Sequence, residues 1–106
     1  MKYPNGLVDI IAGFQLYVPD SALVKTTYEN LLANDSSTPF PFWAKIWPAS
    51  IALSIFLQKE SYWIEDKCVV EIGAGIGLPS FVIAPFAAEI IISDYATEAV
   101  ELIEKN

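Results

Sequence analysis

The sequence predicts an α/β fold with parallel strands, and three observations lead to this class. The segment Cys68–Ile72 is a short apolar run rich in β-branched residues, as expected of a parallel strand covered on both faces. A glycine-rich turn, Gly73–Gly77, follows at once and leads into a helix-forming stretch. A second apolar run, Ala88–Ser93, ends at Asp94 and precedes another helix-forming stretch. This order predicts a βαβα unit with a right-handed crossover.

The first third of the chain predicts a pair of strands. Phe14–Val18 alternates apolar and polar residues and is rich in aromatic and β-branched types, which favours a strand. Leu7–Ile11 is the expected partner, with the turn near Gly13, and Pro19 ends the second strand. The loop that follows later, Asn34–Pro39, is predicted from its composition alone.

Capping residues and prolines indicate where the helices begin. Asp20 or Ser21 can cap the first helix, and Pro48 suits the first turn of the second. The second helix is apolar around most of its circumference, so it is expected to be buried. The expected helices are Ala22 to about Leu32, Pro48 to about Lys59, Leu78 to about Phe86, and Ala96–Lys105.

Composition excludes several classes of function. The chain has 106 residues and no histidine, which removes the usual general base, the usual zinc ligand and the Ser-His and Cys-His nucleophile pairs. We therefore expect no metal site. A net charge of -7 with six basic residues argues against binding to nucleic acid phosphates. Hydrophobic residues make up 54% of the chain, which predicts that some apolar surface meets another structure.

The sequence also predicts a cytoplasmic protein that does not enter a membrane. The longest charge-free stretch, Ile72–Ala88, contains three glycines and two prolines, so no membrane-spanning helix is expected. The first residues carry no secretion signal. Cys68 is the only cysteine, so an internal disulfide is excluded and a reducing compartment is favoured. We expect Cys68 to be a buried, inert side chain.

The glycine turn is the strongest candidate for a ligand site. Glycine allows backbone conformations closed to other residues and lets a ligand approach the main chain. Free N–H groups at the start of the following helix make the turn electropositive. A dinucleotide loop would have its third glycine or an alanine three residues after Gly75, where this chain has Leu78. Glu71, just before the turn, favours a ligand with an amine over a pyrophosphate.

The run Glu71-Ile72-Gly73-Ala74-Gly75-Ile76-Gly77 resembles the first motif of class I S-adenosylmethionine-dependent methyltransferases. The resemblance implies a Rossmann-like fold, with the loop backbone against the amino acid and ribose of S-adenosylmethionine. It also implies that Glu71 helps to hold the ammonium group, that Asp94 accepts the ribose hydroxyls, and that Tyr95 lies near the adenine. The cofactor-binding residues implied are Trp47, Glu71, Gly73, Ala74, Gly75, Gly77, Asp94 and Tyr95.

The upstream stretch Phe42–Ser50 resembles the corresponding segment of the protein-lysine methyltransferase-like subgroup, in which a tryptophan lines the cofactor pocket. Residues 43–106 are then the first half of the methyltransferase domain and residues 1–42 an N-terminal extension of two strands and a helix. The resemblance implies that a protein lysine is the methyl acceptor, although small molecules and other nucleophiles stay open.

Simpler roles stay open for three of these residues. Glu71 could pair with a lysine, Asp94 could cap the helix that follows, and Trp47 could belong to the core. Trp43, Trp63, Phe40 and Phe42 are assigned to packing. No catalytic residue can be named.

The chain departs from the family in length, because a domain of this class has seven strands and only the first two are recognised. We therefore expect a fragment or shortened product that is truncated after the second core strand. On its own it should bind cofactor weakly, lack activity, and associate with itself through the open edge of the strand Cys68–Ile72. The alternatives are a non-catalytic truncated module that acts in dimerisation or regulation, and an NAD-type oxidoreductase, which Leu78 and Glu71 disfavour.

Overall fold

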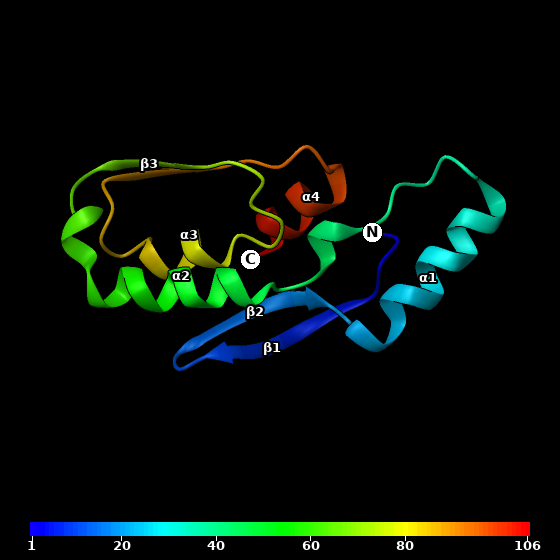
Figure 1. Ribbon diagram of the computed structural model, residues 1–106, viewed down its shortest axis with the longest axis horizontal. Helices are drawn as coiled ribbons and strands as arrows, with labels where there is room; N and C mark the ends of the chain where they lie inside the picture. Colours follow the sequence, from blue (N-terminus) through cyan, green and yellow to red (C-terminus); the bar gives the residue numbers. More distant parts are fainter.

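Two separate two-stranded sheets organise the chain in a computed structural model that describes all 106 residues (Figure 1). The first is an antiparallel hairpin of β1 (Asn5–Ile11) and β2 (Phe14–Pro19), in which Val8 lies opposite Leu16. The second is a parallel pair of β3 (Cys68–Glu71) and β4 (Glu89–Ile92). Both predicted strand pairs are confirmed, and so is the mixed α/β class.

Four helices connect and flank these strands. Each begins where the sequence predicts, to within a residue: α1 (Ser21–Asn34), α2 (Pro48–Lys59), α3 (Leu78–Ile83) and α4 (Thr97–Lys105). The Asp20 carboxylate caps α1 by accepting the Ala22 N–H at 3.0 Å. Two single turns of 3-10 helix, Phe42–Ala44 and Ser61–Trp63, stand before and after α2.

Helix α3 is shorter than predicted because it ends at Ile83 rather than near Phe86. Pro85 has no N–H to donate to the Phe81 carbonyl, so the helical hydrogen bonds are interrupted there. The chain then turns toward β4, and the Phe86 N–H donates to the Ile83 carbonyl at 2.9 Å.

The core joins the hairpin to the βαβα unit. Its buried members come from β2, the glycine turn, α3 and α4, and they are Leu16, Ile76, Leu78, Val82 and Leu102. Helix α1 contributes no buried residue and projects at one end of an elongated molecule that measures 48 × 24 × 22 Å (Figure 1). The site described below lies on the part of the chain that this core holds together.

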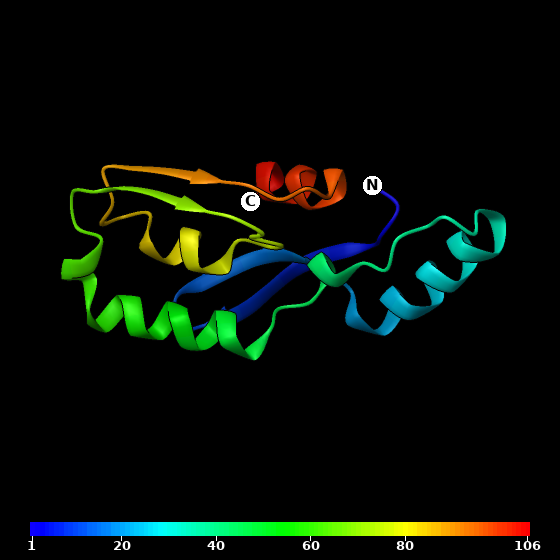
Figure 2. The same ribbon diagram turned by 45° about the horizontal axis from the view of Figure 1, so that its top comes forward.

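The parallel sheet is covered on one face only, which corrects the prediction of a strand buried on both sides. Figure 2 shows α2 and α3 together on one side of β3 and β4, with no helix on the other. On the uncovered side Val70, Ile72 and Ile91 are exposed, to 57%, 85% and 53%. Cys68 is exposed for the same reason, so the prediction that it is buried is wrong.

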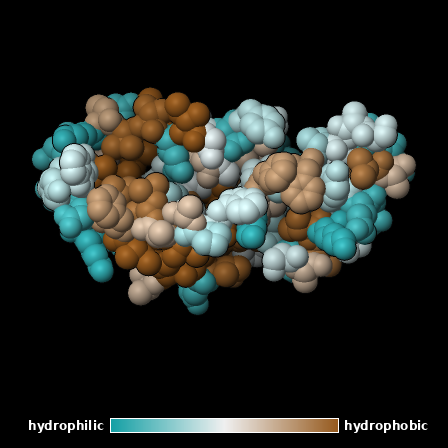
Figure 3. Space-filling view, in the orientation of Figure 1, coloured by the Kyte–Doolittle hydropathy of each residue, from teal (hydrophilic) through white to brown (hydrophobic).

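Helix α2 is also less buried than predicted. Only Ser54 is fully buried, whereas Leu53, Ile55 and Phe56 are exposed. The helix packs mainly against α3, with a smaller contact to the 3-10 turn Ser61–Trp63. Figure 3 shows hydrophobic atoms gathered over the end of the molecule that holds β3 and α2. None of the helices is both long and apolar enough to cross a bilayer.

Candidate functional site

The glycine turn has a backbone that only glycine adopts easily. Gly73, Gly75 and Gly77 have φ values of 64°, 59° and 81°. The turn is fastened to the end of β4, because the Ala74 N–H donates to the Ser93 carbonyl at 2.9 Å. Gly75 lies close to the upstream segment, since a Cβ added there would be 3.3 Å from the carbonyl oxygen of Trp43. The turn is therefore held between β4 and the segment before α2.

Asp94 links the turn to the start of α4. One carboxylate oxygen accepts the Gly75 N–H at 2.8 Å, and the other accepts the Ala96 N–H at 2.9 Å. The second bond closes a turn just before α4; the N-cap of that helix is Ala96 and has no side-chain capping bond, so Asp94 does not cap the helix as considered above. Each oxygen has a further lone pair and the side chain is partly exposed, so the carboxylate can still accept hydroxyl groups.

Glu71 does not pair with a lysine, and its side chain points toward α3. The Ser80 hydroxyl, on α3, donates to the Glu71 carboxylate at 2.6 Å. Burial raises the pKa of Glu71 above its ordinary value, and the bond from Ser80 opposes this by stabilising the charged form. Glu71 thus joins β3 to α3 and lies behind the glycine turn.

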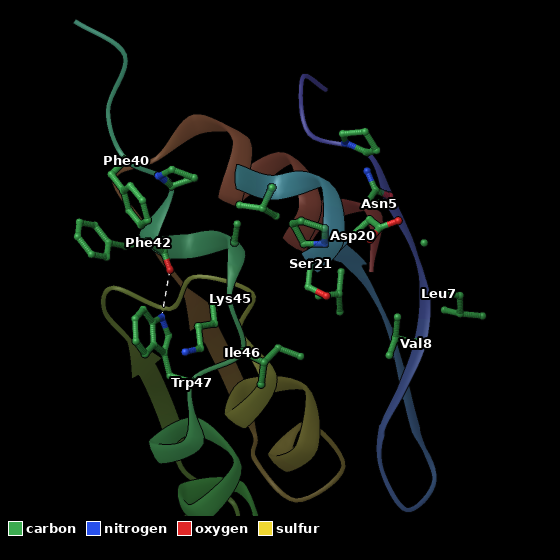
Figure 4. A pocket seen from close by; sticks show the side chains of 17 residues that line it. Asn5, Leu7, Val8, Asp20, Ser21, Phe40, Phe42, Lys45, Ile46 and Trp47 are labelled. Carbon is green, nitrogen blue, oxygen red and sulfur yellow. Dashed lines mark hydrogen bonds between the residues drawn. The ribbon is translucent and has the colours of Figure 1, made fainter. Parts of the chain in front are cut away.

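Trp47 begins α2 with its ring partly exposed. Its indole N–H donates to the Phe42 carbonyl at 3.1 Å, and the Lys45 ammonium lies 4.5 Å from the centre of its ring (Figure 4). Trp43 packs against the core and meets Tyr3 edge to face at 5.6 Å. The tryptophan segment is therefore a structured wall opposite the glycine turn.

These elements enclose a cavity of about 220 Å³, which we call the loop cavity. Seven of the eight predicted cofactor residues line it, namely Trp47, Gly73, Ala74, Gly75, Gly77, Asp94 and Tyr95. Glu71 does not line it. The sequence did not single out the other lining residues, which are Phe42, Trp43, Lys45, Ile46, Ser50 and Ile76. Most of them lie close to Trp47 in the upstream segment, and this closeness in sequence is the signal that could have identified them as lining residues.

The loop cavity combines main-chain groups, one carboxylate and aromatic faces. Such a set suits a ligand with hydroxyl groups and a flat ring. Its volume is below the roughly 300–1,000 Å³ usual for small-molecule sites. No three histidine, cysteine or acidic side chains come together as a metal site would require.

Comparison with known proteins gives a family match. The family described as lysine methyltransferase matches residues 25–106, which include the whole loop cavity.

Individual relatives match over shorter stretches. The chain is 32% identical over 92 residues to the protein N-terminal and lysine N-methyltransferase EFM7 of Cryptococcus neoformans, covering 85% of this chain and 28% of that protein. It is 37% identical over 51 residues to the histone-arginine methyltransferase METTL23 of Xenopus laevis, covering 48% and 22%. It is 35% identical over 51 residues to the protein N-lysine methyltransferase METTL21A of Xenopus tropicalis, covering 48% and 24%. The chain thus spans about a quarter of the length of these relatives.

Proposed function

The chain belongs to the lysine methyltransferase family, and on that premise we propose that it supplies the S-adenosylmethionine-binding part of a protein-lysine N-methyltransferase. The observation that carries the proposal is the loop cavity. There the glycine turn, the Asp94 carboxylate and the Trp47 segment face one another. Residues 43–106 would be the first part of a Rossmann-like domain, with the remaining strands outside this chain.

The residues of the loop cavity fit S-adenosylmethionine. A Cβ at Gly73 would meet nothing within 4 Å, so a ligand can approach the main chain there. Asp94 would accept the ribose hydroxyls, and Tyr95, which is 85% exposed, is free to stack on the adenine. The bound cofactor supplies a methyl group that its sulfonium makes electrophilic. The chain's own residues would orient it and exclude water from one side.

Glu71 has a different role in this proposal from the one the resemblance implies. Its carboxylate lies outside the loop cavity and accepts the Ser80 hydroxyl. We assign it to fixing the end of β3, which positions the glycine turn from behind. A partner for the cofactor's ammonium group is then not found among these residues.

The methyl acceptor we propose is a lysine of a protein. The family description and the name of METTL21A support lysine, whereas the names of EFM7 and METTL23 also include a protein N-terminus and histone arginine. All of these acceptors are nitrogens of proteins. Family membership also sets aside the NAD-type oxidoreductase.

A non-catalytic module is the second candidate, and the uncovered face of β3 and β4 favours it. An apolar face of this kind suits association, either with a second copy or with a regulatory partner. The same face is expected if further parts of a catalytic domain cover it. Cofactor binding separates the two candidates.

The test is an NMR titration of the ¹⁵N-labelled chain with S-adenosylmethionine and, separately, with NAD. We expect S-adenosylmethionine to shift the amides of Gly73, Gly75 and Tyr95, with a dissociation constant of about 1 mM because the cavity is small. Asp94→Asn should weaken this binding at least about tenfold, a loss of roughly 1.4 kcal/mol. Equal shifts with NAD, or no shift at several millimolar S-adenosylmethionine, would contradict the proposal.

A further inference from the structure

A second cavity, larger than the loop cavity, lies beside it. It has a volume of about 870 Å³ and lies between the hairpin, the start of α1 and the segment Phe40–Trp47 (Figure 4). We call it the hairpin groove. Its volume is within the range of sites that hold sizeable ligands.

The walls of the hairpin groove are mainly apolar. Val8 and Val18 come from the hairpin, Val24 from α1, and Phe40 and Ile46 from the connecting segment. Phe40 also packs at 4.7 Å against Phe42, so the aromatic wall is ordered by its own contacts.

The two charged side chains of the groove are already engaged. The Asp20 carboxylate caps α1, and the Lys45 ammonium lies over the Trp47 ring. The groove therefore offers mainly apolar contact, with one acidic and one basic side chain on its wall.

The hairpin groove adjoins the loop cavity. Phe42, Lys45, Ile46 and Trp47 line both. A molecule seated in the groove would thus end beside the place assigned to the methyl donor.

We propose that the hairpin groove docks the stretch of the protein substrate that flanks the methylated residue, through apolar side chains of that stretch. This inference rests on the proposed function, which supplies the methyl donor in the adjoining cavity. The net charge of -7 attracts a basic polypeptide to the surface, while the mainly apolar walls select apolar neighbours of the acceptor. The volume of the groove also calls for an occupant larger than the acceptor side chain alone, and a stretch of polypeptide is of that size.

Two positions of the hairpin provide a test variant and its control. A Cβ at Gly6 would meet nothing within 4 Å, so Gly6→Phe fills the groove without removing any contact. Gln15 on β2 is exposed and does not line the groove, so Gln15→Phe adds a phenyl ring to the same hairpin but outside the groove. Phenylalanine is favourable in strands, so both variants should fold.

The probe is a capped peptide that carries leucines around one lysine and arginines at its ends, titrated into the ¹⁵N-labelled chain. We expect shifts at Val8, Val24 and Ile46, binding at least about tenfold weaker with Gly6→Phe, and unchanged binding with Gln15→Phe. A second peptide with serine in place of leucine should also bind at least about tenfold weaker. Equal binding of the two peptides would mean that charge alone attracts them, and the docking role would be wrong.

A second variant and a dilution series complete the experiment. Should Gly6→Phe give the spectrum of an unfolded chain, Val24→Trp fills the groove from α1, which has no buried residues to disturb. Shifts at Val8 and Val24 on dilution without peptide would show that a second copy occupies the groove, which overturns the proposal. Peptide binding without any response to S-adenosylmethionine would contradict the proposed function but support the docking groove. A response to S-adenosylmethionine without peptide binding would support the proposed function but contradict the docking groove.

Discussion

Gly73 and Gly75 share a left-handed backbone but differ in what surrounds them. At Gly73 an added Cβ meets nothing within 4 Å, whereas at Gly75 it would be 3.3 Å from the Trp43 carbonyl oxygen. Gly73→Ala should therefore lower the free energy of unfolding by about 1–2 kcal/mol, the cost of a left-handed alanine. Gly75→Ala should lower it further, because the Trp43 segment must also move. Urea denaturation of both variants measures the difference.

Gly6→Ala is the control for this pair, because Gly6 has open space and no positive φ. It should leave the free energy of unfolding unchanged or raise it slightly. If Gly75→Ala proved no more destabilising than Gly73→Ala, the close approach of the turn to Trp43 would not matter for stability.

Glu71 should make the stability of the fold depend on pH. Burial raises its pKa above the ordinary value of 4.5, so the folded state prefers the protonated form. This contribution to stability is complete below the ordinary pKa and is lost as the pH rises through the raised pKa of the folded state. Glu71→Gln cannot titrate at this position. As the pH rises through this window, the free energy of unfolding of the original chain should therefore fall relative to that of the variant. Urea denaturation across the window tests it, and parallel curves for the two proteins would contradict it.

Ser80 should restrain that shift. Its hydroxyl donates to the Glu71 carboxylate and lowers the pKa, so Ser80→Ala should raise the pKa of Glu71 further. A ¹³C titration of the Glu71 carboxyl follows this directly. Ser54→Ala is the matched control, because Ser54 is an equally buried serine whose hydroxyl donates to the Ser50 carbonyl instead. A fall in the Glu71 pKa in Ser80→Ala would show that the hydroxyl does not stabilise the charged form.

At the scale of the residue, the sequence predicted position better than orientation. Glycines 73, 75 and 77, Asp94 and Tyr95 follow the carboxyl ends of two parallel strands, which meet at one edge of a sheet, so their proximity could be anticipated. The direction of the Glu71 side chain could not, because it depends on a hydroxyl nine residues later on α3.

Among the elements, α4 and the hairpin are joined by side chains at the end of the helix. The Tyr17 N–H donates to the Asn106 side-chain oxygen at 2.6 Å, and the Asn106 amide donates to the Tyr17 carbonyl at 3.1 Å. Lys105 adds a bond to Asn5 at 2.8 Å and lies 4.2 Å from the centre of the Tyr17 ring. These contacts hold β2 against the helix that follows β4.

Asn106→Ala should therefore loosen the hairpin without unfolding the core. Loss of the bond at Tyr17 should cost about 1 kcal/mol locally, so the Tyr17 amide should exchange with solvent roughly five- to tenfold faster. Hydrogen-exchange NMR measures this, with Glu104→Ala as the control on the same turn of α4. Unchanged exchange at Tyr17 would mean that other contacts alone hold the hairpin.

The elements also show where sequence patterns reach their limit. Strand pairs and helix starts could be predicted because hydrophobic periodicity, caps and prolines are local signals. The burial of α2 and β3 could not be predicted. An apolar helix or strand indicates that another structure covers it, but does not indicate whether the covering structure belongs to this chain. Leu53 and Val70 carry the signal of a core position and are exposed.

For the whole molecule, the high apolar content has a structural location. Exposed large hydrophobic residues lie on α2 and on the uncovered face of β3 and β4, and others lie on the hairpin and in the segment Phe40–Trp47, while parts of β2, α3 and α4 form the core. A surface of this kind is normally covered by another structure. The composition thus predicted correctly that apolar surface would be left for contact, without giving its place.

The uncovered sheet should make the isolated chain associate with itself. Strand β3 pairs with β4 on one side only, so its other edge presents unpaired N–H and C=O groups beside the exposed Val70. Sedimentation equilibrium should show a monomer–dimer equilibrium, and Val70→Lys should weaken it at least about tenfold, because a lysine on an edge strand opposes pairing. Leu23→Lys places the same charge on an exposed leucine of α1, at the far end of the molecule, and should leave the equilibrium unchanged. A chain that stays monomeric throughout, or equal effects of the two lysines, would show that the open edge does not drive association.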